Sequence, residues 1–138
     1  MWEYEHSVVA DVTPEAVWAL YSDTTKWESW DQGLDAIELH GPFEVGTKGH
    51  LKPKGQDGFP FTLIEAEPNK RFTDETVVNG LVLHFIHILE AQADGRTKIT
   101  HRVEITGPAA AEAAPHVGPA VTADIPATVA RLAELAAA

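Results

Sequence analysis

The chain has no cysteine, few basic residues and no long apolar run, and each absence excludes a class of function. Without cysteine, it has no disulfide, no thiol nucleophile and no thiolate metal site. Only 10 lysine and arginine residues stand against 21 aspartate and glutamate residues, giving a net charge of −11. That balance repels nucleic-acid phosphates and anionic membrane surfaces, so neither nucleic acid nor membrane is an expected partner.

Signals for export or membrane insertion are also missing. No apolar run approaches the ~18 residues of a membrane-spanning helix. The stretch from Met1 to His6 has neither the basic start nor the apolar run of a signal peptide. We therefore expect a cytoplasmic protein. The length of 138 residues predicts a single domain over 1–138. A domain of this size buries about 68–70% of its unfolded surface, enough for a core and an internal cavity.

Apolar and polar residues alternate along much of the chain, which predicts a largely antiparallel sheet. The first strand places Trp2, Tyr4 and His6 on one face and Glu3 and Glu5 on the other. One apolar face and one charged face are typical of a half-buried strand. About seven strands are predicted, over 2–12, 36–40, 47–53, 59–67, 71–77, 81–91 and 97–106.

Two short helices are predicted after the first strand. Thr13 is a suitable N-cap for the first of them, and Pro14 suits its first helical position. Trp27 and Trp30, three residues apart, mark the second.

One long helix is predicted at the C-terminal end. Asp124 is its expected N-cap, and Pro126 falls in its first turn. The Ala-rich stretch 109–118 contains Pro115, and we expect it to be irregular or a broken helical turn. The apolar stripe of the helix recurs at i+3 and i+4 and consists of Val121, Ile125, Val129, Leu132 and either Leu135 or Ala136.

The strands 81–91 and 97–106 meet at Asp94-Gly95, a strong signal for a two-residue type I′ hairpin turn. In that register His84 lies opposite Ile105, and Ile88 lies opposite His101. The face expected to be buried then carries Val82, His84, Ile86, Ile88, Ile99, His101, Val103 and Ile105. The opposite face carries an apolar set that predicts either a homodimer contact or a covering neighbour, namely Leu83, Phe85 and Leu89.

This order of elements leaves a single long helix to cover the apolar face of the sheet. We therefore predict an α+β helix-grip fold. A curved antiparallel sheet of about seven strands wraps around the long C-terminal helix, and two short helices after the first strand close one end. A space between helix and sheet remains inside.

The chain resembles the START-like (SRPBCC) superfamily of helix-grip domains, in its polyketide cyclase/dehydrase-like branch. The resemblance covers nearly the whole chain. It implies an elongated cavity for an apolar small molecule, but it assigns no catalytic residue, because the superfamily includes lipid carriers, hormone receptors, cyclases and chaperone-stimulating domains. The matching stretches are Glu5-His6-Ser7-Val8, Thr13-Pro14-Glu15-Ala16-Val17-Trp18, Lys26-Trp27-Glu28-Ser29-Trp30-Asp31, Gly46-Thr47, Glu65-Ala66-Glu67-Pro68-Asn69-Lys70-Arg71-Phe72 and Asp94-Gly95-Arg96-Thr97-Lys98-Ile99-Thr100.

His84, His101 and Tyr4 are the candidate catalytic residues. In the predicted register both imidazoles point into the concave face, roughly 10–15 Å apart. A neutral imidazole can act as a general acid or base near pH 7, and the Tyr4 hydroxyl can orient a carbonyl. The alternative is that each is a core residue whose polar atoms bond to a neighbouring group.

The candidate ligand-binding residues are aromatic or aliphatic side chains expected to face the cavity, together with His6. Such side chains line ligand pockets, but they equally fill hydrophobic cores, and the sequence leaves both readings open. The set consists of His6, Trp27, Trp30, Phe59, Phe61, Ile86, Val103, Val121, Ile125 and Val129.

No metal or other cofactor is expected. His84 and His87 have a metal-motif spacing, but residues three apart on a strand point to opposite faces. Asp74 and Glu75 alternate in a strand, so one of them faces inward, where burial raises a carboxyl pKa. The sequence does not show which one.

These features predict that the chain binds a hydrophobic, polyketide- or lipid-like small molecule in the internal cavity. A cyclase or dehydratase reaction on that molecule would make it an enzyme. The alternative function is a protein-interaction module of the chaperone-stimulating type, with a filled core.

Overall fold

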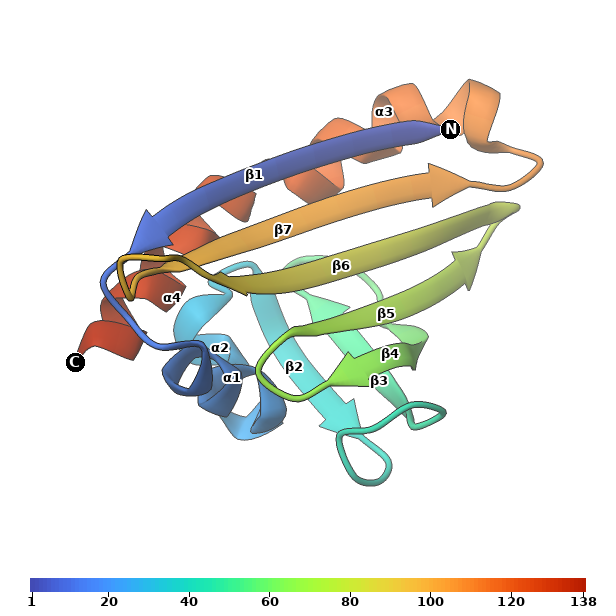
Figure 1. Cartoon of the computed structure of the whole chain (residues 1–138). Coiled ribbons are helices and arrows are strands. Elements are labelled where there is room, and N and C mark those ends of the chain that lie inside the picture. The colour runs from blue at the N-terminus through green and yellow to red at the C-terminus, as the bar shows by residue number, and fades with distance from the viewer.

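The computed structural model of the chain describes all 138 residues, in an open seven-stranded sheet with helices on one face (Figure 1). The predicted strands are confirmed to within two residues at every end. They are β1 (Trp2–Ala10), β2 (Leu34–Leu39), β3 (Lys48–Pro53), β4 (Phe59–Glu67), β5 (Arg71–Val78), β6 (Leu81–Ala91) and β7 (Thr97–Thr106).

The sheet is entirely antiparallel, with the strand order β1-β7-β6-β5-β4-β3-β2. The first strand therefore pairs with the last, as the helix-grip fold requires. This pairing brings His6 directly beside His101 and Tyr4 beside Val103. Residues of the first and the last strand along the chain thus lie side by side on one face of the sheet.

Two short helical segments follow β1, as predicted. Helix α1 (Pro14–Ser22) begins at the N-cap Thr13, whose hydroxyl accepts a hydrogen bond from the Ala16 amide at 3.2 Å. A single 3₁₀ turn, η1 (Thr24–Lys26), leads into α2 (Trp27–Trp30). Figure 1 shows α1 and α2 at the end of the sheet where the β6–β7 hairpin turns.

The C-terminal region is helical from Ala110 onward, so the expectation of an irregular 109–118 stretch is wrong. Helix α3 (Ala110–Thr122) leads through a short break into α4 (Ile125–Ala137), and together they make one long bent helix (Figure 1). Pro115 and Pro119 lie inside α3 on its exposed side. The carbonyls that lose their helical partner there face water, which lowers the cost of an internal proline.

The β6–β7 register differs by one residue from the prediction. The amide of Gln92 bonds to the Arg96 carbonyl at 2.8 Å, so three residues form the loop. Gly95 takes φ +87°, as in a type I turn followed by a left-handed residue. The shift pairs His87 with His101 and His84 with Glu104.

A one-residue slip moves every side chain of a strand to the other face. The concave face of β6 therefore carries Leu83, Phe85, His87 and Leu89, and the predicted placement of Val82, His84, Ile86 and Ile88 there is wrong. Leu83 and Leu89 are buried inside the molecule. The apolar face on which a homodimer contact was expected therefore lies on the inner side of the sheet. The predicted face of β7, with His101 and Val103, is confirmed as buried.

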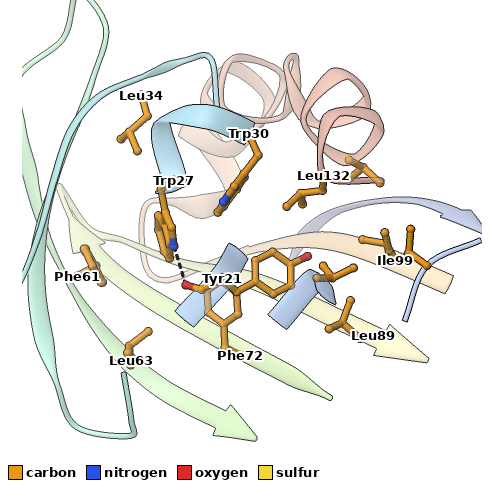
Figure 2. Close-up of a cluster of buried hydrophobic side chains, with 13 residues drawn as sticks. Tyr21, Trp27, Trp30, Leu34, Phe61, Leu63, Phe72, Leu89, Ile99 and Leu132 are labelled. Atoms are coloured by element: carbon orange, nitrogen blue, oxygen red, sulfur yellow. Dashed lines mark hydrogen bonds between the residues drawn. The ribbon is translucent and has the colours of Figure 1, made fainter. Parts of the chain in front are cut away.

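Two hydrophobic clusters form the core. The larger one packs α1, α2 and α4 against the sheet and includes Tyr21, Trp27, Trp30, Phe72 and Leu132 (Figure 2). The smaller one joins α3 to β6 and β7 through Leu83, Val103, Ile105 and Ala114. The buried rings of His87 and His101 pack against Tyr21 of the larger cluster, and His87 also stacks on Phe72.

Candidate functional site

A buried hydrogen bond links α1 to the inner face of the sheet. The hydroxyl of Tyr21 lies 2.8 Å from Nε2 of His101, with both residues almost inaccessible to solvent. Burial raises the pKa of the Tyr21 hydroxyl. Burial also holds the pKa of His101 well below its usual range, and His87 and His6 add to this effect. Both groups are therefore neutral near pH 7.

His87 lies beside His101 and is neutral as well. Its ring stacks on Phe72 with a centroid distance of 3.8 Å and an interplanar angle of 6°. Nδ1 lies 3.2 Å from the Phe72 carbonyl, which can only accept, so Nδ1 carries the proton. Burial lowers the pKa of His87 to about 3. The His87 and His101 ring centroids are 4.6 Å apart, so the two imidazoles pack against each other.

Asp74 is the inward carboxyl of the Asp74-Glu75 pair. Its side chain is 7% exposed and forms no hydrogen bond or ion pair with another residue. Burial, together with the nearby Asp31, raises the pKa of Asp74 to about 8. Glu75 points outward, where it lies 2.8 Å from Nε2 of His84. The structure thus answers the question that the alternation pattern left open.

The inner face holds three buried polar side chains on neighbouring strands, namely Asp74, His87 and His101. Asp74 bonds to no other side chain, and the one side-chain partner of His101 is Tyr21. Thr76 Oγ1, on the same face of β5 as Asp74, is buried without a hydrogen-bond partner. Buried polar groups are normally paired in native proteins. Polar groups gathered at one place with few partners therefore mark a candidate site.

The structure separates the three predicted catalytic residues. His101 and Tyr4 lie on the inner face, and Tyr4 is half-buried beside Val103. His84 lies on the convex face between Glu75 and Glu104, so the prediction that it lines the cavity is wrong. The cause is the one-residue difference in the hairpin loop.

The predicted ligand-binding residues also divide into groups. His6 and Val103 are on the inner face, and Val121 and Ile125 of the C-terminal helices pack toward it. Trp27 and Trp30 are buried, and their ring N–H groups donate to the carbonyls of Tyr21 and Leu20. Figure 2 shows both rings within the larger core cluster. Phe61 and Val129 are buried in that cluster, Phe59 is half-buried on β4, and Ile86 lies on the convex face, where it was not expected.

Sequence reasoning missed Tyr21 and His87 as site residues and left Asp74 undecided against Glu75. Tyr21 falls on the apolar stripe of α1, and that periodicity indicates burial but no hydrogen-bond partner. His87 was assigned to the outer face because of the hairpin register. For Asp74, the alternation pattern shows that one of two neighbouring acids faces inward, but it does not show which one.

Two hollows lie at the edges of the helical layer. One of about 110 Å³ is lined by Gln32, Gly33, Asp124, Ala127 and Thr128. The other, of about 400 Å³, lies between the start of β1 and α3 and includes Met1, Trp2, Ala110 and Pro115. Neither is the elongated cavity that the family resemblance implies. No three His, Asp or Glu side chains are placed to hold a metal ion, and none of the helices has the length and apolar character needed to cross a membrane.

Residues 1–137 match the model of the protein family described as polyketide cyclase / dehydrase and lipid transport. The chain belongs to this family. The assignment agrees with the helix-grip architecture and with the arrangement of a sheet around a long C-terminal helix. No curated protein sequence matches the chain significantly.

Several solved structures share the fold. An aromatase/cyclase from Streptomyces sp. R1128 superimposes with a TM-score of 0.80 at 12% identity, over 98% of this chain and 93% of that one. Norcoclaurine synthase from Thalictrum flavum, solved with dopamine and hydroxybenzaldehyde, gives 0.74 at 14% identity, over 97% and 85%. A hypothetical protein from Helicobacter pylori gives 0.75 at 16% identity, over 97% and 86%. Identities this low show a common fold and nothing finer.

Proposed function

We propose that this chain binds an apolar small molecule with at least one hydrogen-bonding group, between the inner face of the sheet and the C-terminal helices. The observation that carries the proposal is the group of three buried polar side chains on the inner face, Asp74, His87 and His101, of which Asp74 bonds to no other side chain. A bound hydroxyl or carbonyl would pair with these groups. The family description, which includes lipid transport, supports a ligand that is largely apolar.

The surroundings of these groups suit an apolar body. Phe85 and Val103 flank the site on the sheet, and Phe85 remains partly accessible although it lies on the inner face. On the opposite side, Val121 and Ile125 are half-buried and pack toward the smaller hydrophobic cluster. Apolar walls with a few convergent polar groups are the usual design of a small-molecule site.

Acid–base catalysis on the bound molecule is the second candidate function, and the state of Asp74 favours it. With a pKa of about 8, Asp74 is a carboxylic acid at neutral pH and becomes a base with a small rise in pH. His101 stays neutral and is oriented by Tyr21. A cyclisation or dehydration needs one group that removes a proton beside a carbonyl and one that protonates a departing oxygen. Asp74 and His101 would share these two roles, with Tyr4 orienting the carbonyl.

Binding can be tested with the neutral fluorescent probe N-phenyl-1-naphthylamine, which avoids repulsion by the net charge of −11. We expect its fluorescence to rise on mixing with the protein. A Val121→Trp substitution would place a much larger side chain between the helix and the sheet and should weaken binding about tenfold or more. The matched control is Ala120→Trp, whose site is exposed on the same helix, and it should bind like the wild type.

Far-UV circular dichroism would show whether each variant folds. A folded wild-type protein that gives no fluorescence rise would overturn the binding proposal and favour the alternative, a protein-interaction module with a filled interior. Equal loss in both tryptophan variants would place the bound probe outside the space between helix and sheet, which also contradicts the proposal.

A further inference from the structure

The outer edge of strand β1 (Trp2–Ala10) has no partner strand. β1 lies at one border of the sheet (Figure 1) and pairs with β7 along its whole length without a bulge. The Leu89 amide bonds to the Lys70 carbonyl at 2.7 Å, so Leu89 turns its backbone groups away from Ile99, its partner on β7. Backbone direction alternates along an antiparallel pair. Ile99 therefore bonds to Val8 of β1, and the odd-numbered residues of β1 point their backbone groups away from the sheet.

No other part of the chain bonds to these outward backbone groups. The amides and carbonyls of Glu3, Glu5, Ser7 and Val9 form no hydrogen bond to a helix or loop. The inner-face side chains of β1 are also less covered than those of its neighbour, since all of them are half-buried and their β7 partners are all buried. Those of β1 are Trp2, Tyr4, His6, Val8 and Ala10, and those of β7 are Thr97, Ile99, His101, Val103 and Ile105.

The features that normally protect a sheet edge are largely missing from β1. The strand at the opposite border, β2 (Leu34–Leu39), is shorter and has an irregular register at its start. β1 contains no proline and no bulge. Its two charged side chains, Glu3 and Glu5, both pair with Arg102, at N–O distances of 2.6 and 3.5 Å. A long, regular edge whose acids already have a basic partner is suited to pairing with another strand.

We propose that β1 pairs with β1 of a second copy of this chain, antiparallel about a two-fold axis at His6, so that the two sheets join edge to edge. His6 is the central residue of the strand, so this axis gives the longest overlap. It places Glu3 opposite Val9. Glu5 then lies opposite Ser7, and each pair exchanges its outward N–H and C=O groups. Such a self-complementary contact is the usual arrangement in a homodimer.

The charge pattern of β1 selects this axis. Like charges directly opposite each other destabilise a pair of strands. Moving the axis one or two residues toward the start of the strand sets Glu5 against Glu5 or Glu3 of the other copy. Moving it one or two residues the other way sets Glu3 or Glu5 against Asp11. Among the registers that pair most of the strand, the axis at His6 is therefore the one that sets no acid against an acid.

The dimer brings the inner faces of the two copies together at their edges. His6 lies beside His101 in each copy, and the two His6 side chains meet at the axis. Each copy thus contributes a candidate ligand-binding residue next to the site of the other. Tyr4, half-buried in one copy, lies opposite Val8 of the second. Dimerisation does not depend on the proposed function, because it rests on the edge of the sheet.

Sedimentation equilibrium of the full chain measures the self-association, and we expect a monomer–dimer equilibrium in the micromolar range. Ser7→Pro removes an outward N–H and none of the bonds to β7, a position at which an edge strand tolerates proline. It should raise the dissociation constant about tenfold or more, because the symmetric contact loses the hydrogen bond twice. Ser7→Ala keeps the N–H and is the matched control, which should associate like the wild type.

Charge variants at the same position test the register. Ser7→Lys places an amine opposite Glu5 of the second copy and should lower the dissociation constant about threefold or more. Ser7→Glu should raise it by a similar factor, because two acids then face each other. Ala120→Lys, exposed on α3, changes the net charge as Ser7→Lys does and should leave the dissociation constant unchanged.

A cross-link gives a second test of the register, because the chain has no cysteine of its own. The two His6 residues would form a non-hydrogen-bonded pair, whose Cα atoms lie about 4.5 Å apart. A disulfide can span that distance, so His6→Cys should form a covalent dimer under mild oxidation. Val9→Cys is exposed, but it would lie about 20 Å from its counterpart and should remain a monomer on a non-reducing gel.

A wild-type chain that stays monomeric at its highest soluble concentration overturns the inference. Association of Ser7→Pro as strong as that of the wild type, with circular dichroism showing a folded chain, also overturns it. If this variant does not fold, the charge variants decide, and equal effects of Ser7→Lys and Ser7→Glu contradict the pairing. Cross-linking of Val9→Cys as readily as His6→Cys contradicts it as well.

Discussion

Tyr21 and His101 show at the scale of single residues how the interior is held together. The Tyr21 hydroxyl is the one partner of Nε2 of His101, and both residues are buried. Removing one partner of a buried hydrogen bond leaves the other unsatisfied, at a cost of about 1–3 kcal/mol. We expect Tyr21→Phe to lower the free energy of unfolding by about that amount in urea denaturation.

A double-mutant cycle separates this bond from simple packing. Tyr21→Phe combined with His101→Leu should be less destabilised than the sum of the two single variants, because no unpaired group remains. His84→Leu, on the convex face, is the control and should change stability by less than about 1 kcal/mol. Strict additivity of the two interior variants would show that the hydrogen bond contributes nothing measurable.

The residues of the candidate site were harder to predict than the strands that carry them. Alternation placed Tyr4 and His6 correctly, because β1 has a charged face that can only be outside. It left Asp74 and Glu75 undecided, since two neighbouring acids carry no such contrast. The prediction put His84 on the inner face and His87 on the outer face, whereas the structure has the reverse. Because β6 is apolar on both faces, only the length of the hairpin loop determines which imidazole lies inside.

At the scale of elements, the loop between β6 and β7 allows a direct test of what determines the register of these two strands. Deleting Ala93 would join Gln92 to Arg96 through Asp94-Gly95, the two-residue turn preferred in hairpins. The buried residues of β6 and β7 fix the pairing of the strands. We therefore expect the deletion to preserve the register and to change the free energy of unfolding by less than about 1 kcal/mol.

Amide exchange measured by NMR would show whether the pairing of Gln92 with Arg96 and of His87 with His101 survives. A loss of several kcal/mol, or a shift of the β6 amides to new partners, would contradict this expectation.

The prolines of helix α3 show in the same way that the tertiary fold decides what local sequence leaves open. They cost helix stability by propensity, but they face solvent, and only the tertiary fold shows which side of the helix that is.

At the scale of the whole molecule, buried groups of opposite type set the dependence of stability on pH. The pKa of Asp74 is raised to about 8, so the stability due to its protonated form is complete below about pH 4 and is lost as pH rises through 8. Asp31, whose pKa burial also raises, acts in the same direction. The pKa values of His87 and His101 are lowered, so their contribution is present above about pH 6.5 and is lost as pH falls.

These opposed slopes predict a stability maximum near about pH 6, since two histidines lose stability below it and Asp74 loses stability above it. Urea unfolding at a series of pH values measures the profile. Asp74→Asn should flatten the alkaline side and make the protein more stable than the wild type at pH 8.5 by several kcal/mol, because each pKa unit corresponds to about 1.4 kcal/mol. Glu75→Gln should leave the alkaline side unchanged. A wild-type stability that stays constant from pH 6 to 9 would show that Asp74 is charged and paired in the folded protein, contrary to its isolated position on β5.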